Sequence, residues 1–117
     1  MWEIIFSSHF KDWLLSQEIN LKKRLAAALL NLEHYGPLLP RPYADTVHGS
    51  SYHNMKELRI QYAGRPIRVF YAFDPERKAI VLCAGNKRGD KQFYQRMIAL
   101  ADQIFTNHLE HAEDRNT

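Results

Sequence analysis

The sequence contains a single cysteine, Cys83, in 117 residues. One cysteine excludes an intramolecular disulfide and a cysteine-rich zinc site, and it fits a reducing compartment. No apolar run approaches the roughly 20 residues that span a bilayer. An acid, Glu3, stands where a signal peptide carries basic residues. Glycine-rich phosphate loops and nucleophile elbows are also missing. We therefore expect a cytoplasmic domain with no membrane association, no metal and no other cofactor.

The composition that is present suits a folded domain with an uneven charge. Hydrophobic residues make up 45% of the chain and aromatic residues 12%, enough for a packed core. Residues 56–96 hold ten basic and four acidic residues, a net charge of +6, whereas the remainder carries −3. Such a cationic half favours a polyanionic partner, above all nucleic acid, because phosphate contacts release counterions. The same charges can equally form a solvated face.

Hydrophobic periodicity predicts seven elements in the order β-α-α-β-β-β-α. The expected strands cover residues 2–6, 56–62, 67–73 and 79–84; the helices surround Phe10, cover 21–34 and follow Asp90. This is an α+β domain, an antiparallel sheet with a helical hairpin and a C-terminal helix, and we expect the helices on one face. Residues 1–109 form the predicted domain and 110–117 a polar tail. The unpatterned segment 36–55 is either a docked loop or a binding loop.

Alternation along the strands gathers cations on the polar side of the sheet. Arg59 and Arg68 face that side, Lys56 stands at the strand entrance, and Tyr94 opens the last helix. Cleavage of RNA through its own 2′-hydroxyl requires a base, cations for the charge that develops on phosphorus, and an acid for the leaving oxygen. Nearby cations favour deprotonation of lysine and tyrosine, so either residue type can serve as a weak base or acid. The alternative to a catalytic role is that both arginines are exposed strand residues that pair with Glu57 or with a helix acid.

Four segments in order resemble one known family. They are Lys56-Glu57-Leu58-Arg59, Arg65 through Pro75, Leu82 through Gly89, and Phe93-Tyr94. Together they are similar to the RelE/ParE toxin superfamily, most of all to its HigB-like branch, which is related to phage Gp49. Trp2, Trp13, Gly36-Pro37 and Arg41-Pro42 fit the same branch. The resemblance implies a RelE-like fold over about residues 2–109.

The resemblance also implies a function. The chain would be the toxin of a type II toxin–antitoxin system, a metal-independent endoribonuclease that cuts mRNA on the ribosome. Its partner would be a helix-turn-helix, HigA-like antitoxin, and operator DNA would be bound only through that complex. Catalytic roles carry over to Lys56, Arg59, Arg68, Lys87 and Tyr94, and we expect RNA binding by Arg65, Arg88 and Lys91. Asn86 departs from the family, which has an aromatic residue there.

Other assignments compete with this one. A ParE-like toxin would inhibit DNA gyrase by binding, without nuclease chemistry, and a degenerate toxin would only bind antitoxin and DNA. His53 precedes the cationic strand and is a second candidate for the general acid. His108 and His111 are three residues apart, a weak metal-site pattern. Cys83 lies in the most apolar strand, so we expect it to be an inert core residue.

Overall fold

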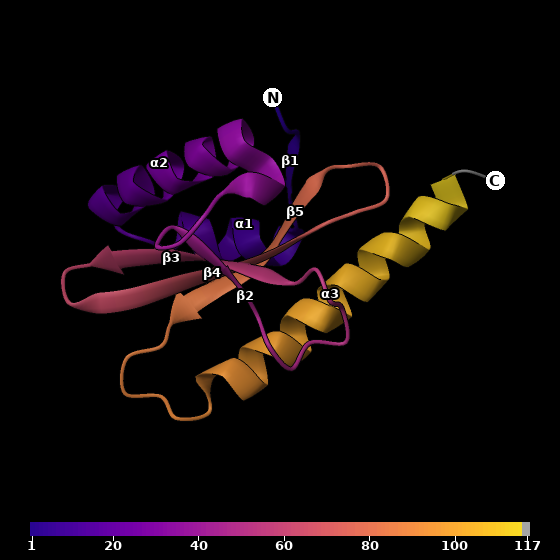
Figure 1. Ribbon diagram of the computed structural model, residues 1–117. Helices are drawn as coiled ribbons and strands as arrows, with labels where there is room; N and C mark the ends of the chain where they lie inside the picture. Colours follow the sequence, from indigo (N-terminus) through magenta and orange to yellow (C-terminus); the bar gives the residue numbers. More distant parts are fainter. Residues whose placement is uncertain (116–117) are drawn as a thin grey trace.

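The computed structural model describes the backbone of residues 1–115 and the side chains of residues 1–111. A five-stranded mixed sheet in the order β1-β5-β4-β3-β2 forms the centre of an α+β fold (Figure 1). The elements are β1 (Ile4–Phe6), α1 (Ser8–Leu15), α2 (Ile19–Tyr35), the short 3-10 helix η1 (Gly36–Leu38), β2 (Ala44–Thr46), β3 (Lys56–Tyr62), β4 (Arg65–Phe73), β5 (Ala79–Asn86) and α3 (Phe93–Arg115).

The predicted order of elements is confirmed, but the sheet has one additional strand and one parallel pair of strands. The three-residue strand β2 lies in the segment expected to be a loop and pairs with the start of β3. The first strand, β1, pairs in parallel with β5, so the sheet is mixed rather than antiparallel throughout. Parallel neighbours need a long connection between them, and the helical hairpin together with β2–β4 supplies it. Periodicity locates strands but carries no direction, which is why the sequence missed this pairing.

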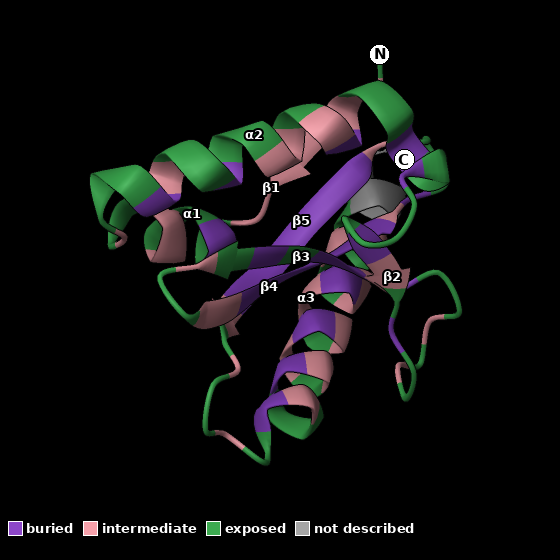
Figure 2. Cartoon of the chain, turned by 60° about the vertical axis from the view of Figure 1, so that its left-hand side comes forward, coloured by how far each residue is buried: buried purple, intermediate pink, exposed green. Residues whose placement is uncertain are grey.

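The expectation that all helices share one face of the sheet is wrong. Phe10 of α1 and Leu25 of α2 pack with Val69 on one face, whereas Phe93 of α3 packs with Phe70 on the other. Figure 2 shows the buried strand β5 between α2 and α3. Six of the nine residues of β4 and six of the eight residues of β5 are buried. A strand that is apolar on both sides needs cover on both sides, so α3 closes the second face.

Ser7 and Gly36 fix the two ends of the N-terminal helical hairpin. Ser7 caps α1, since its hydroxyl accepts a hydrogen bond from the Phe10 amide at 3.0 Å and donates one to the Leu82 carbonyl at 2.6 Å. Gly36 ends α2 with φ +56°, and a Cβ there would overlap the Trp2 indole. Only glycine satisfies both the positive φ and that close approach.

The segment between β2 and β3 is docked on α3. The Ser50 hydroxyl donates a hydrogen bond to the Asp102 carboxylate, and the Tyr52 and Thr106 hydroxyls are hydrogen-bonded. The docked-loop alternative is thus confirmed for this part of the chain. α3 continues to Arg115, so the helix enters the segment from Glu110 that was expected to be a polar tail. Within the described residues, no helix has the length and hydropathy that a membrane span requires.

Candidate active site

A buried carboxylate is the centre of the polar cluster between the sheet and α3. Glu57 of β3 is 6% exposed. Its Oε1 accepts a hydrogen bond of 2.8 Å from the Tyr94 hydroxyl of α3, and the same oxygen lies 3.8 Å from Arg68 Nε. Its Oε2 lies 4.0 Å from Arg59 Nε. One carboxylate therefore connects three of the five predicted catalytic residues.

The two arginines lie side by side because of strand register. Arg59 of β3 and Arg68 of β4 are directly opposed partners in an antiparallel pair. Their guanidinium groups would repel each other across the strands, and Glu57 offsets that repulsion. Arg68 is the more buried arginine, with its side chain 7% exposed against 35% for Arg59. Arg68 Nε is buried and has no hydrogen-bond partner among the described atoms, so the ion pair with Glu57 at 3.8 Å is the contact that offsets its burial.

Tyr94 and Lys87 complete the cluster from the β5–α3 side. The Lys87 ammonium lies 5.5 Å from the centre of the Tyr94 ring, a cation–π distance. Burial and the hydrogen bond to Glu57 raise the pKa of Tyr94, although Arg68 opposes them. The expectation that nearby cations promote deprotonation is therefore wrong for Tyr94, because burial and the hydrogen bond to Glu57 raise its pKa more than Arg68 lowers it. Tyr94 is a proton donor at neutral pH.

The other predicted site residues lie away from the cluster. Lys56 is opposed to Tyr71, so alternation places it on the α1–α2 face of the sheet. Arg65 forms an ion pair of 2.8 Å with Glu18 at the start of α2. Hydrogen bonds from Tyr62 and Arg65 hold the pKa of Glu18 below its usual range. These contacts give Arg65 a structural partner far from Glu57 in the fold.

Arg88 and Lys91 are exposed on the connection between β5 and α3. This connection also carries Lys87, so the two cations extend the positive charge outward from the cluster. Asp90, the expected helix cap, accepts a hydrogen bond from the Gln92 amide and pairs with Arg96. Both cations add exposed positive charge on the solvent side of this connection.

Sequence reasoning missed Glu57 as a functional residue and treated it only as a neutralising partner. The signal available in the sequence was that Glu57 and Arg59, two residues apart, lie on the same polar side of the strand. A hollow of about 430 Å³ adjoins the cluster at the β3 edge and contains Arg24 and Tyr43 beside Arg59 and Arg68. These residues come from α2 and from the segment before β2, and no local pattern linked them to β3.

The histidines have other neighbours than expected. His53 is exposed in the loop before β3. His48 is exposed and lines a second hollow of about 430 Å³ together with Tyr94. His108 contacts the buried Asp74 carboxylate at 2.8 Å, so it joins α3 to the β4–β5 turn. His111 contacts the Asn107 carbonyl one helical turn away.

Known proteins resemble this chain in sequence and in fold. Residues 12–106 match the family described as phage derived protein Gp49-like, DUF891. Two proteins of Mycobacterium tuberculosis that carry toxin names are similar. HigB2 is 45% identical over 104 residues, 87% of this chain and 52% of HigB2, and HigB3 is 40% identical over 107 residues, 91% of this chain and 92% of HigB3. The chain thus spans about half the length of HigB2.

A solved structure agrees at the level of fold. A mutant of the E. coli toxin RelE in the free state superposes with a TM-score of 0.56 at 11% identity, covering 79% of this chain and 90% of RelE. This similarity confirms the expected RelE-like fold, and the sequence matches confirm the branch. The chain belongs to the Gp49-like family, the HigB-like branch of the RelE/ParE toxin superfamily.

Proposed function

We propose that the chain is a metal-independent endoribonuclease that cuts mRNA on the ribosome and thereby inhibits translation as the toxin of a toxin–antitoxin pair. The observation that carries the proposal is the Glu57–Tyr94 hydrogen bond of 2.8 Å between two arginines. An acid–base pair beside a phosphate clamp is what 2′-hydroxyl chemistry requires. A toxin that acts only by binding has no need of such a pair.

Exposure decides which group meets the substrate. Glu57 is almost buried, whereas Tyr94 is half-buried and Arg59 is open to solvent. Tyr94 therefore contacts the 2′-hydroxyl, and Glu57 acts from behind it. The Tyr94 oxygen takes the 2′-hydroxyl proton while its own proton passes to Glu57. The raised pKa of Tyr94 makes this relay necessary, because the free phenolate is scarce at neutral pH.

The remaining groups handle charge and the leaving oxygen. As the 2′-oxygen bonds to phosphorus, Arg59 and Arg68, which unlike Glu57 line the hollow at the β3 edge, stabilise the added negative charge. The bond from phosphorus to the 5′-oxygen then breaks, and Lys87 donates a proton to that oxygen. The products are a 2′,3′-cyclic phosphate and a 5′-hydroxyl, and exchange with solvent returns Glu57 and Lys87 to their charged forms. Arg88 and Lys91 bind flanking phosphates. No role is assigned to Lys56 or Arg65.

The test is cleavage in a reconstituted translation system, with message 5′ ends mapped in the presence and absence of ribosomes. We expect new cuts in translated messages with wild-type protein, and about 100- to 10,000-fold slower cutting with Tyr94→Phe or Glu57→Gln, the range of general acid–base catalysis. Because the two residues act as one relay, the double variant should cut no more slowly than the slower single variant. Tyr35→Phe, on an exposed tyrosine of α2, is the matched control.

Several results would contradict this mechanism. Intact messages together with altered DNA supercoiling would replace the nuclease by a gyrase inhibitor. Independent, multiplicative effects of Tyr94→Phe and Glu57→Gln would disprove the relay but not the nuclease. Full activity of Glu57→Gln would leave Glu57 as a positioning residue for the arginines.

A further inference from the structure

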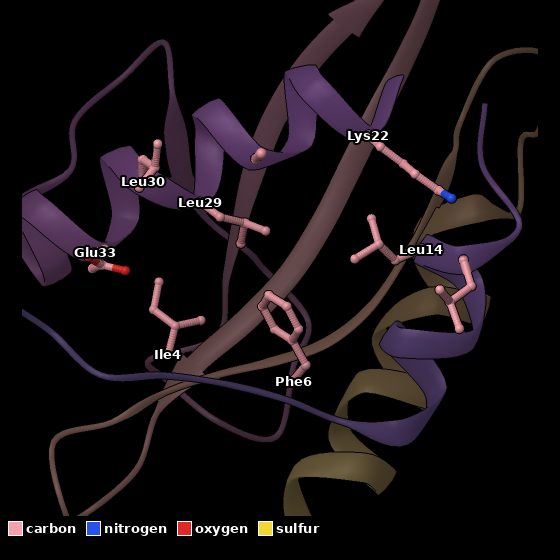
Figure 3. A pocket seen from close by; sticks show the side chains of 9 residues that line it. Ile4, Phe6, Leu14, Lys22, Leu29, Leu30 and Glu33 are labelled. Atoms are coloured by element: carbon pink, nitrogen blue, oxygen red, sulfur yellow. The ribbon is translucent and has the colours of Figure 1, made fainter. Parts of the chain in front are cut away.

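Two cavities of the molecule have linings of different chemistry. The cavity between α1, α2 and β1 is lined mainly by apolar side chains (Figure 3). The hollow of about 430 Å³ at the β3 edge, called the β3-edge hollow below, contains polar groups instead. Its lining includes three arginines, Arg24, Arg59 and Arg68, together with Asn31 and Tyr43. Its volume lies in the range of roughly 300–1,000 Å³ that is typical of small-molecule sites.

The charge of the β3-edge hollow is positive. Among the described residues, no carboxylate lines it. Arg24 of α2 donates a hydrogen bond of 2.9 Å to the Gln61 carbonyl, so its guanidinium is held at the open edge of β3. A guanidinium has five N–H donors, and this one bond leaves Arg24 able to bind a phosphate. Asp45 of the neighbouring β2 pairs with Arg41 at 2.7 Å, which neutralises that carboxylate. The hollow therefore suits an anionic ligand.

Tyr43 offers this ligand an aromatic surface. Its carbonyl accepts a hydrogen bond of 2.9 Å from the Arg59 amide, and its own amide donates one of 3.0 Å to the Pro40 carbonyl. The backbone of Tyr43 is thus fixed beside Arg59, whereas its side chain is 54% exposed and contributes little to the core. Exposed aromatic rings beside cations are the surfaces on which proteins stack the bases of single-stranded nucleic acids.

Asn31 adds the third component, an amide. It is half-buried in α2, and both Asn31 and Tyr43 also line a smaller neighbouring hollow of about 230 Å³. An asparagine side chain both donates and accepts hydrogen bonds, as the edge of a base does. Stacking on an aromatic ring combined with hydrogen bonds to a base edge is the usual way in which proteins read unpaired RNA.

We propose that the β3-edge hollow binds one nucleotide next to the scissile phosphate, with its base stacked on Tyr43 and facing the Asn31 amide, and with Arg24 on the adjoining phosphate. The inference deepens the proposed nuclease function and rests on it, because Arg59 and Arg68 belong both to the hollow and to the Glu57 cluster. A phosphate held by these two arginines has the hollow beside it. Tyr43 and Asn31 determine specificity and take no part in the proton transfers.

The first experiment measures binding of uncleavable RNA to the full chain. The probes are the 2′-O-methyl homotrinucleotides of A, C, G and U, which lack the attacking hydroxyl, and NMR titration gives Kd. We expect the tightest probe to shift the signals of Asn31 and Tyr43. Tyr43→Ala should raise Kd about 5- to 150-fold, the range for the loss of one stacked base. Tyr43→Phe keeps the ring, so its Kd should match wild type.

Tyr35→Ala is the matched control for Tyr43→Ala. Tyr35 is 49% exposed and lines the smaller neighbouring hollow, but it does not line the β3-edge hollow. Its Kd should be unchanged. Thermal unfolding of all variants checks that they are folded.

The second experiment maps message 5′ ends in the reconstituted translation system. Wild-type protein should prefer one base at a position next to the cut, and Asn31→Ala should flatten that preference. The readout is the ratio of cuts at the most and least favoured bases, which a merely structural role would leave unchanged while slowing all cuts alike. Asn20→Ala, on an exposed residue in the first turn of α2, should keep the wild-type ratio.

The outcomes separate this inference from the nuclease itself. Unchanged Kd for Tyr43→Ala overturns the stacking surface, and an unchanged cut pattern for Asn31→Ala overturns base recognition; both results leave the nuclease intact. Absence of binding of all four probes to wild-type protein overturns the hollow as an RNA site. Absence of wild-type cuts overturns the proposed nuclease, whereas trinucleotide binding that Tyr43→Ala weakens would still support the hollow, because this binding requires neither ribosome nor cleavage.

Discussion

The two faces of the sheet differ in the charged residues that they bury. Between the sheet and α3 lie Glu57, Arg68 and Asp74, and these are the buried charged residues within the described part of the chain. Two of the three contact α3 directly, Glu57 through Tyr94 and Asp74 through His108. The face covered by α1 and α2 is packed with leucine, isoleucine and aromatic side chains instead.

This difference separates the residues proposed for catalysis from the residues that stabilise the fold. Buried charges cost free energy unless they are paired, so a protein that only needed a stable second layer would have used apolar residues there. The α3 face also has an apolar core that includes Phe70, Leu82 and Phe93, so its buried charges are confined to the positions where Tyr94 and His108 of α3 meet the sheet. The α1–α2 face carries apolar burial and, at its rim, an apolar groove lined by Leu15, Leu29 and Leu30 among others. Variants on one face should therefore change activity, and variants on the other should change stability.

The largest expected effect is on the polar face. Arg68→Ala should slow message cleavage about 100- to 1,000-fold, as the loss of one transition-state donor does. It should leave a folded protein, because Glu57 keeps the Tyr94 hydrogen bond and lies 4.0 Å from Arg59. The measurement is the cutting rate in the translation system, with thermal unfolding as the check on folding.

Arg65→Ala is the matched control, since Arg65 lies on the same strand but pairs with Glu18. It should cut at the wild-type rate. A similar loss of cleavage in both variants would show that positive charge on the strand matters rather than the geometry around Glu57.

Much of the fold was predictable because it depends on local patterns. Period-two alternation located β3 at its observed bounds, and Gly36-Pro37 marked the end of α2. The parallel pairing of β1 with β5 and the position of α3 on the second face were not predictable in this way. Both depend on how distant elements pack. The apolar run 79–84 indicates a strand covered on both faces, but it does not say which helix covers the second face.

In the candidate site, too, contacts that follow from local patterns were predictable and contacts between distant elements were not. Cross-strand register brought Arg59 and Arg68 together as predicted, because both lie on the polar side of adjacent strands. Lys56 was included because it matches a basic residue of the family at the start of the strand, but it lies an odd number of residues from Arg59 and so faces the other side of the sheet. Glu57 was overlooked because a carboxylate among cations was taken for simple neutralisation. Only the packing of α3 against β3, which brings the Tyr94 hydroxyl within hydrogen-bond distance of Glu57, shows that this carboxylate accepts a hydrogen bond from Tyr94.

On the apolar face, Leu25→Ala should lower the free energy of unfolding by about 2–5 kcal/mol. Leu25 is 1% exposed in the core between α2 and the sheet. Denaturant titration measures the change, and Leu30→Ala on the same helix should shift it by no more than about 0.5 kcal/mol. Cleavage per folded molecule should match wild type for Leu25→Ala. A cleavage defect at full folding would mean that the two faces are coupled through the sheet.

The smallest effect concerns Cys83, which is buried under α3. Burial raises the pKa of its thiol from 9.0 to about 12. Since the folded state holds the proton more tightly than the unfolded chain, the stability from this shift is fully present below pH 9 and is lost as the pH rises toward 12. Between pH 9 and pH 10 the free energy of unfolding should fall by about 1 kcal/mol more in wild type than in Cys83→Ala. Denaturant titrations at the two pH values measure this difference. Equal slopes would mean that solvent reaches the thiol, and that the α3 face is open beneath the helix as well as at Arg59.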